Sequence, residues 1–263
     1  MLTCRRTKRA PSERDGYAVV LLHAFPLSSG MWKQQLDALE NASIATIAPN
    51  AYGIEGSEKQ ESWTFAQYAR DLADLLDRTG CRKATIAGLS MGGYQAFEFW
   101  RRFPERTASL VLCDTRAEAD APEAAMQRQE FINAVIQRGA GEAADRMMPN
   151  YFTPDTVHAN PELVERTKAL ITAQSVTAIT SAMKAIMGRA DATALLHDIS
   201  CPVLVMNGRE DRLTTSDTAT QIAESIPGAT IELIGNAAHL SNLERPEEFN
   251  RALLDHIRQV TTA

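Results

Sequence analysis

Short apolar runs and longer amphipathic stretches alternate along most of this chain. The apolar runs are rich in Val, Ile, Leu and Ala and are bounded by turn formers, which is typical of strands buried on both faces of a parallel sheet. We therefore predict strands at residues 17–23, 44–48, 84–89, 109–113, 203–207 and 230–234. Between these runs, apolar residues recur at helical spacing, which predicts helices at residues 31–39, 65–79, 91–103, 216–226 and 246–260.

The alternation stops between residues 116 and 197, where Ala, Glu, Gln, Arg and Met dominate. Pro and Gly at the expected ends indicate helices at residues 122–139, 141–148, 161–173 and 176–187. The sequence thus predicts an α/β fold with a mostly parallel sheet and helices on both faces, formed by residues 1–115 and 198–263, and a helical lid inserted at residues 116–197. Five methionines of this insertion are expected either to fill an ordinary core or to line an apolar pocket: Met126, Met147, Met148, Met183 and Met187.

Composition and charge narrow the range of functions. The chain has 263 residues, of which 44% are hydrophobic, and this is enough for a sizeable core. Its net charge is −6, and basic residues cluster only within residues 1–9, which argues against a nucleic-acid partner. We expect that basic segment to be solvated, with a role in targeting or membrane contact as the lesser alternative.

The chain carries neither a membrane-span pattern nor a signal-peptide pattern. Its four cysteines lie far apart in the sequence, and nothing in their spacing suggests disulfides. These features favour a protein of the reducing cytoplasm that is not associated with a membrane.

The segment Gly88-Leu89-Ser90-Met91-Gly92 has the G-x-S-x-G pattern and lies between a predicted strand and a predicted helix. In such a turn the serine takes a strained backbone conformation that lifts its hydroxyl clear of the sheet, and the glycines avoid collisions with neighbouring elements. Three specified positions also match by chance in roughly one chain of this length in ten. Because the strand and the helix supply the expected context, we interpret Ser90 as a nucleophile.

A serine hydroxyl becomes a good nucleophile only when a base takes its proton and an acid orients that base. Asp211 and His239 each follow a predicted strand, and the carboxyl ends of parallel strands share one edge of a sheet. We therefore expect Asp211 as the orienting acid and His239 as the base, in the chain order that such sites show. Asp114 and Glu210 are rival acids, and Asp211 could instead serve only as a helix cap.

The other histidines are expected to have different roles. His158, His197 and His256 lack any metal-ligand spacing and are expected to be solvated. His23 is expected to be a structural hydrogen-bonding group rather than a base.

Together these motifs make residues 17–260 resemble the α/β-hydrolase superfamily, most closely its small bacterial carboxylesterases and enol-lactonase-like lactonases. His23-Ala24-Phe25-Pro26 is similar to the oxyanion loop of that family, usually His-Gly-x-Pro. The resemblance implies that the backbone N–H groups of Phe25 and Met91 form the oxyanion hole, and that no metal or cofactor takes part.

The chain departs from the family pattern at three places. The family usually has two antiparallel strands before the strand at residue 17, whereas here residues 2–6 could form one edge strand at best. Ala24 replaces the common Gly of the oxyanion loop, and Asn50 stands where the family often has Asp.

The resemblance implies a serine hydrolase that cleaves small, rather apolar carboxylic esters through an acyl-enzyme. A lactonase is the nearest alternative, and a perhydrolase or a non-catalytic ligand receptor on the same scaffold stays open. Epoxide hydrolases and haloalkane dehalogenases use an Asp nucleophile, so Ser90 argues against both. The expected partner is a small-molecule ester or lactone, and the sequence leaves monomer and homodimer both open.

Overall fold

The strands form one sheet in the computed structural model, which describes residues 1–11 and 16–262. Along the sheet the order is β1-β3-β2-β4-β5-β6-β7. All neighbouring pairs are parallel except β1 with β3, which is antiparallel. The strands are β1 (Cys4–Arg6), β2 (Tyr17–Leu22), β3 (Thr46–Pro49), β4 (Lys83–Leu89), β5 (Thr107–Cys113), β6 (Val203–Gly208) and β7 (Thr230–Ile234).

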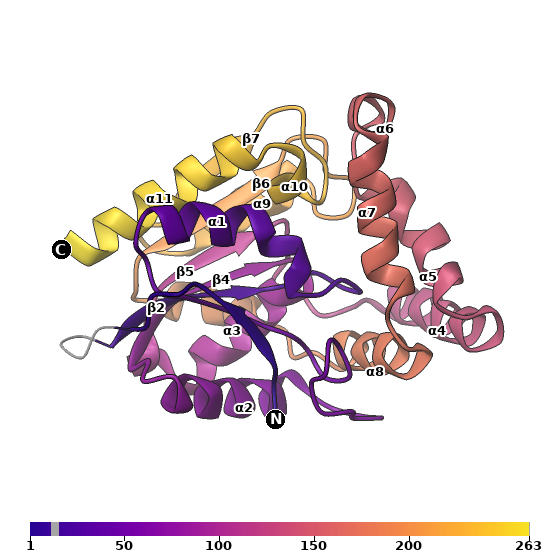
Figure 1. Ribbon diagram of the computed structural model, residues 1–263, viewed down its shortest axis with the longest axis horizontal. Coiled ribbons are helices and arrows are strands. Elements are labelled where there is room, and N and C mark those ends of the chain that lie inside the picture. Colours follow the sequence, from indigo (N-terminus) through magenta and orange to yellow (C-terminus); the bar gives the residue numbers. More distant parts are fainter. Residues whose placement is uncertain (12–15, 263) are drawn as a thin grey trace.

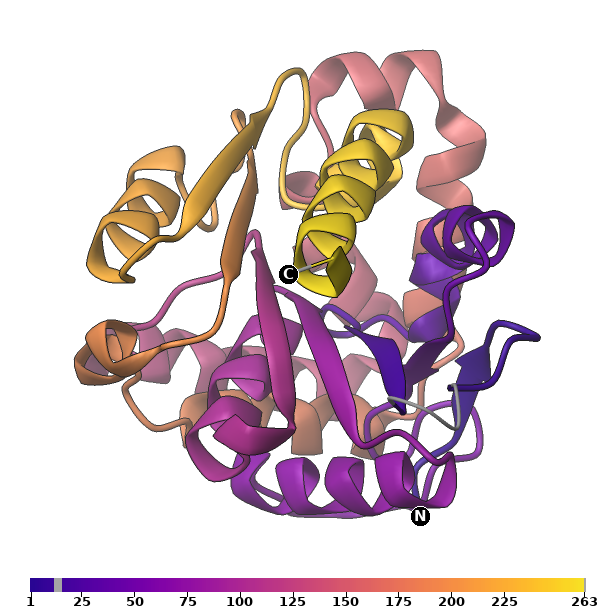
Figure 2. The ribbon, with the colours of Figure 1, turned by 90° about the vertical axis from the view of Figure 1, so that its left-hand side faces the viewer.

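Helices cover both faces of this sheet (Figures 1 and 2). On one face lie α1 (Lys33–Asn41) and α11 (Pro246–Thr262), which contact each other, and on the other lie α2 (Phe65–Arg78), α3 (Met91–Arg102) and α9 (Ser216–Ser225). Residues 18–22 of β2, an interior strand of the sheet, are fully buried between these two layers. The continuous apolar runs of the sequence therefore correspond to strands with helices on both sides, as predicted.

The segment between β5 and β6 is helical throughout its regular structure and lies to one side of the sheet (Figure 1). It contains α4 (Pro122–Arg138), α5 (Ala140–Met147), α6 (Pro154–Ala159), α7 (Pro161–Thr172) and α8 (Val176–Met187). The sequence analysis missed α6 because six residues are too few to show a helical period, although Thr153 caps the helix and Pro154 begins it. We call residues 116–197 the helical insertion.

Short helical turns complete the chain. The 3-10 turns are η1 (Ser29–Trp32), η2 (Pro104–Arg106), η3 (Met148–Asn150) and η4 (Thr193–Asp198), and α10 (Ser241–Glu244) is a single turn that the sequence pattern did not predict. None of the helices within the described residues has both the length and the apolarity needed to span a bilayer.

The basic side chains at the N-terminus, Arg5, Arg6, Lys8 and Arg9, are exposed to solvent as expected, but the backbone of this segment joins the sheet. Leu2 is only 3% exposed, β1 pairs with the edge strand β3, and Arg5 forms an ion pair with Glu55 at 2.9 Å. The single edge strand agrees with the expectation for residues 2–6. The strand pairing and the buried Leu2 fix the backbone of this segment, which the charge pattern alone does not reveal.

Two expectations about exposure are wrong. His256 lies on α11 and is 5% exposed, because the helix places it on the face that packs against the sheet. Met126 is 62% exposed on α4 and contributes neither to a core nor to a pocket wall. Trp32 and Trp100 are buried in the core.

Candidate active site

Ser90 lies in the sharp turn between β4 and α3 and has a left-handed backbone conformation with φ 56° and ψ −112°. The glycines on either side allow this turn. A Cβ on Gly88 would lie 2.1 Å from the carbonyl oxygen of Gly92, and one on Gly92 would lie 2.1 Å from that of Leu22. Because both obstacles are backbone atoms, only glycine fits at these two positions, as the motif predicted.

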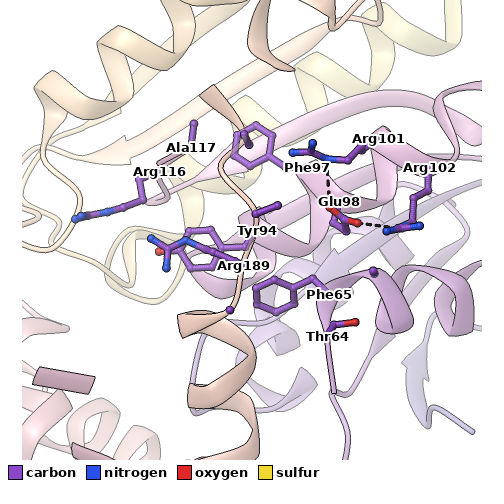
Figure 3. A pocket seen from close by; sticks show the side chains of 14 residues that line it. Thr64, Phe65, Tyr94, Phe97, Glu98, Arg101, Arg102, Arg116, Ala117 and Arg189 are labelled. Atoms are coloured by element: carbon purple, nitrogen blue, oxygen red, sulfur yellow. Dashed lines mark hydrogen bonds and ion pairs between the residues drawn. The ribbon is translucent and has the colours of Figure 1, made fainter. Parts of the chain in front are cut away.

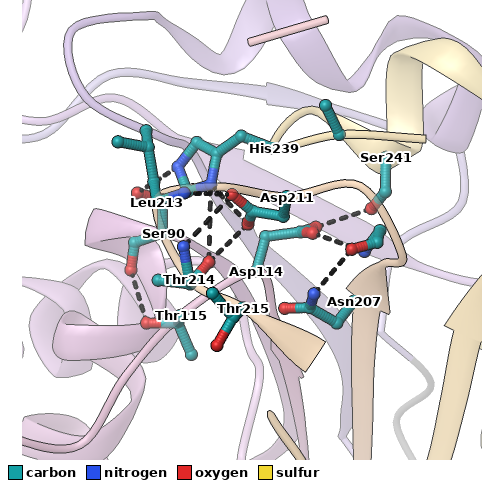
Figure 4. Close-up of polar contacts among 12 residues, drawn as sticks. Ser90, Asp114, Thr115, Asn207, Asp211, Leu213, Thr214, Thr215, His239 and Ser241 are labelled. Carbon is teal, nitrogen blue, oxygen red and sulfur yellow. Dashed lines mark hydrogen bonds and ion pairs between the residues drawn. The ribbon is translucent and has the colours of Figure 1, made fainter. Parts of the chain in front are cut away.

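Hydrogen bonds from β5 and the loop that follows it hold the Ser90 turn. The Ser90 N–H donates to the carbonyl of Cys113 at 2.9 Å, and the Thr115 hydroxyl donates to the Ser90 carbonyl at 2.8 Å (Figure 4). Residues with unfavourable backbone conformations persist only where their surroundings over-determine them, and this turn is such a place. The serine hydroxyl is therefore held at the amino end of α3.

His239 and Asp211 come from the loops after β7 and β6 and meet Ser90 at the carboxyl ends of the strands (Figure 4). The Oγ atom of Ser90 lies 2.9 Å from Nε2 of His239, and Nδ1 of His239 lies 2.8 Å from Oδ2 of Asp211. Both side chains of the His239–Asp211 pair are almost completely buried. The structure thus brings together the three residues that the sequence analysis selected.

The Asp211 carboxylate is fixed by its own loop. Its Oδ1 atom accepts hydrogen bonds from the backbone N–H groups of Leu213 at 2.7 Å and Thr214 at 3.1 Å. Burial alone raises the pKa of Asp211, but the adjacent His239 and the Thr214 donors outweigh burial, so this pKa lies below its usual value. Asp211 therefore stays ionised, and it is not a helix cap, because Thr215 caps the helix that follows, α9.

The rival acids do not reach His239. Asp114 is fully buried and accepts hydrogen bonds from the Gly208 N–H at 2.8 Å and the Ser241 hydroxyl at 2.6 Å (Figure 4). Burial raises the pKa of Asp114 well above its usual value. Glu210 is exposed to solvent. Asp114 thus joins the ends of β6 and α10 instead of orienting the histidine.

The loop that carries Phe25 lies beside Ser90. Within the described residues, the backbone N–H groups of Phe25 and Met91 have no hydrogen-bond acceptor, so both stay free for a ligand. His23 is buried below this loop, and burial lowers its pKa to about 4. Its neutral ring accepts the Ala51 N–H at 3.0 Å through Nε2, while Nδ1 lies 2.9 Å from the Ala24 carbonyl. His23 is thus the structural group that the sequence predicted.

Two residues near the site were missed by the sequence analysis. Tyr151, from the helical insertion, is fully buried, stacks against the His239 ring at 5.9 Å between centroids, and donates its hydroxyl to the Phe25 carbonyl. Glu244 accepts the Ala238 N–H through one oxygen and the Thr153 N–H, at 2.8 Å, through the other. No local pattern marks either residue, because both act through contacts with distant segments.

A cavity of about 340 Å³ lies above Ser90, between the sheet and the helical insertion. Ser90, His239 and Phe25 contribute to it from the core of the fold, whereas α4 and α8 contribute Phe131 and Met183 from the insertion. Among the described residues, no group of three or more His, Cys, Asp or Glu side chains is arranged to hold a metal ion.

Comparisons with known proteins agree with this architecture. The family described as alpha/beta hydrolase fold matches residues 17–246. A 3-oxoadipate enol-lactonase 2 from Acinetobacter baylyi is 27% identical over 241 residues, which cover 92% of this chain and 88% of the enol-lactonase.

Solved structures are similar over nearly the whole chain. A thermophilic esterase from Thermogutta terrifontis, solved with malate bound, has a TM-score of 0.93 and 33% identity, covering 98% of this chain and 93% of the esterase. The enol-lactonase from Burkholderia xenovorans LB400 has a TM-score of 0.86 and 25% identity, covering 98% of this chain and 96% of the enol-lactonase. This protein belongs to the alpha/beta hydrolase family and is similar to its enol-lactonases and esterases.

Proposed function

We propose that this protein is a serine hydrolase that cleaves small carboxylic esters through an acyl-enzyme intermediate. The observation that carries the proposal is the continuous chain of contacts from Ser90 through His239 to Asp211, at 2.9 and 2.8 Å, under a cavity open to a small ligand. Nucleophile, base and orienting acid at these distances are what acyl transfer needs.

The first step forms the acyl-enzyme. His239 takes the proton of Ser90 as the hydroxyl oxygen attacks the ester carbonyl, and Asp211 stabilises the imidazolium that results. The free N–H groups of Phe25 and Met91, at the amino end of α3, donate to the oxyanion. His239 then gives its proton to the leaving alkoxide, and the alcohol departs.

The second step releases the acid. Water attacks the acyl-enzyme while His239 takes a proton from it, and collapse of the second oxyanion returns the proton to Ser90. The proton transfers of both steps use only Ser90, His239 and Asp211, which already contact one another. We propose that the helical insertion acts as the lid over this site, since α4 and α8 contribute walls of the cavity.

A lactonase is the second candidate, because curated relatives of this chain are enol-lactonases. A cyclic ester follows the same two steps, except that its alcohol stays attached to the acyl group. The site geometry serves both substrates, so turnover must decide between them. Location in a reducing cytoplasm stays a prediction from the wide spacing of the cysteines, which are free thiols here.

The test is turnover of a series of p-nitrophenyl esters and simple lactones by wild type and Ser90→Ala. We expect hydrolysis by wild type and its loss in Ser90→Ala, with a melting temperature close to that of wild type, because only one oxygen atom is removed. Turnover that survives in the variant would refute the role of Ser90. A folded wild type that binds these compounds without turnover would indicate a receptor.

A further inference from the structure

The charged side chains around the cavity above Ser90 do not balance. Among the described residues, the arginine and carboxylate side chains that line it are Arg116, Arg128 and Asp120. The rest of the wall is largely apolar and includes Phe25, Phe131, Met147, Met183 and Ile186. A cavity built only for a neutral, apolar ester needs no arginine in its wall.

Asp120 does not neutralise the positive charge of the cavity, because it forms ion pairs with two arginines. It forms a bidentate contact with Arg128, at 2.5 Å to Nε and 3.1 Å to Nη2, and a second ion pair with Arg189 at 2.8 Å. Burial raises the pKa of Asp120, but the two guanidinium groups outweigh burial and lower it. One ionised carboxylate between two guanidinium groups leaves one positive charge in excess.

Arg189 is buried and is not among the described residues that line this cavity. Its side chain is 3% exposed, and each of its three nitrogen atoms donates to Asp120 or to the carbonyls of Glu118 and Ile186. Its guanidinium also lies 4.4 Å above the Tyr94 ring (Figure 3). Arg189 therefore holds Asp120 in place and leaves the contact with a ligand to Arg128.

Arg128 keeps one terminal nitrogen for the cavity. Nε and Nη2 face Asp120, but Nη1 faces only the sulfur of Met183, at 3.5 Å, and a thioether is a weak acceptor. The side chain is 26% exposed, and both Arg128 and Met183 line the cavity. A carboxylate of a ligand can therefore replace the Met183 sulfur as the acceptor of the Arg128 Nη1 donor.

Arg116 brings a second positive charge to the same cavity. Its guanidinium donates to the neutral carbonyl of Leu213, and it forms no ion pair with a carboxylate of the described chain. A neighbouring cavity of about 250 Å³ shows the contrast, since Arg101 and Arg102 there are paired with Glu98 (Figure 3). Arg116, whose guanidinium forms no ion pair among the described residues, lines both cavities.

We propose that Arg128 and Arg116 form a carboxylate subsite, and that the preferred substrate is a half-ester of a small dicarboxylic acid or a lactone that carries a free carboxylate. This proposal rests on the proposed function and names its substrate class. Guanidinium groups bind carboxylates through charge-assisted hydrogen bonds, and excess positive charge in a partly enclosed cavity attracts anions. The apolar wall contacts the carbon chain between the carboxylate and the ester.

The test compares two substrates that differ in one charge, p-nitrophenyl hydrogen glutarate and its neutral methyl ester. We expect wild type to favour the anionic substrate in kcat/KM by about tenfold or more, as one charge-assisted hydrogen bond suffices for such a factor. Raising the ionic strength should lower this preference. Arg128→Gln and Arg116→Gln should each reduce the ratio by about tenfold.

Arg138→Gln is the matched control. Arg138 lies on α4, as does Arg128, but it is 59% exposed and pairs with Glu142 away from the cavity. The control makes the same change in net charge and should leave the substrate ratio unchanged. Arg116→Gln keeps the test decisive if Arg128→Gln fails to fold, because Arg116 has no carboxylate partner that its loss would leave unpaired.

Binding to Ser90→Ala separates this subsite from the hydrolase activity. Calorimetry should detect monomethyl glutarate binding to Ser90→Ala and about tenfold weaker binding after adding Arg128→Gln. A Ser90-dependent esterase that prefers the neutral ester, or whose ratio is insensitive to both arginines, would overturn the subsite and leave the proposed function standing. Arginine-dependent binding without any turnover would support the subsite and refute the hydrolase.

Discussion

Replacing Asp211 by Asn tests whether Asp211 orients His239 or only packs beside it. In the native site Oδ1 of Asp211 accepts two backbone N–H groups, from Leu213 and Thr214, and Oδ2 faces Nδ1 of His239. The asparagine oxygen must stay with those two N–H groups, so its NH₂ group faces His239. Nδ1 then has to accept a hydrogen bond, which forces the proton onto Nε2, where it can no longer receive the proton of Ser90.

The expected loss follows from this change of tautomer. The equivalent substitution in a known serine protease lowers kcat by about 10⁴, which corresponds to about 5.5 kcal/mol in the activation free energy. Because the same contacts are present here, we expect Asp211→Asn to reduce kcat for a p-nitrophenyl ester by several orders of magnitude. The binding cavity does not include Asp211, so KM should change little.

Asp114→Asn is the matched control for this experiment. Asp114 accepts hydrogen bonds from the Gly208 N–H and the Ser241 hydroxyl, and an asparagine can accept the first and donate to the second. Turnover should therefore stay within tenfold of wild type. Single-turnover kinetics measure the chemical step directly. A loss below tenfold in Asp211→Asn, or a larger loss in Asp114→Asn, would refute the assignment of the orienting acid.

Two further predictions concern a positioning contact and pH dependence. Tyr151→Phe removes the hydroxyl that donates to the Phe25 carbonyl and leaves the ring stacked on the histidine. We expect kcat to fall by about fivefold with KM nearly unchanged, since one hydrogen bond is worth roughly 1 kcal/mol. An unchanged kcat would contradict a role in holding this loop. Burial lowers the pKa of His256 to about 4, below its value of 6.5 in the unfolded chain. The unfolded state therefore binds the extra proton first as pH falls, so this residue should cost the folded state about 3 kcal/mol between pH 6.5 and 4. Urea unfolding across this range should show a shallower loss of stability in His256→Leu, and a loss as steep as in wild type would contradict the prediction.

The sequence by itself determined the local architecture. Continuous apolar runs can only be buried between two layers, so the parallel strands and the helices between them follow from hydrophobic patterning. The Ser90 turn could also be predicted, because a side chain on Gly88 or Gly92 would collide with backbone atoms of adjacent elements. Asp211 and His239 could be selected because residues beyond the ends of parallel strands meet at one edge.

Only the tertiary structure decided which contacts these residues make. Asp114 and Asp211 both follow strands, and the choice between them depends on the direction of each side chain. Tyr151 and the arginines of the cavity come from the helical insertion, where helical periodicity predicts the helices but not how they pack over the core. Side-chain contacts between distant segments depend on packing geometry, which a local pattern does not contain.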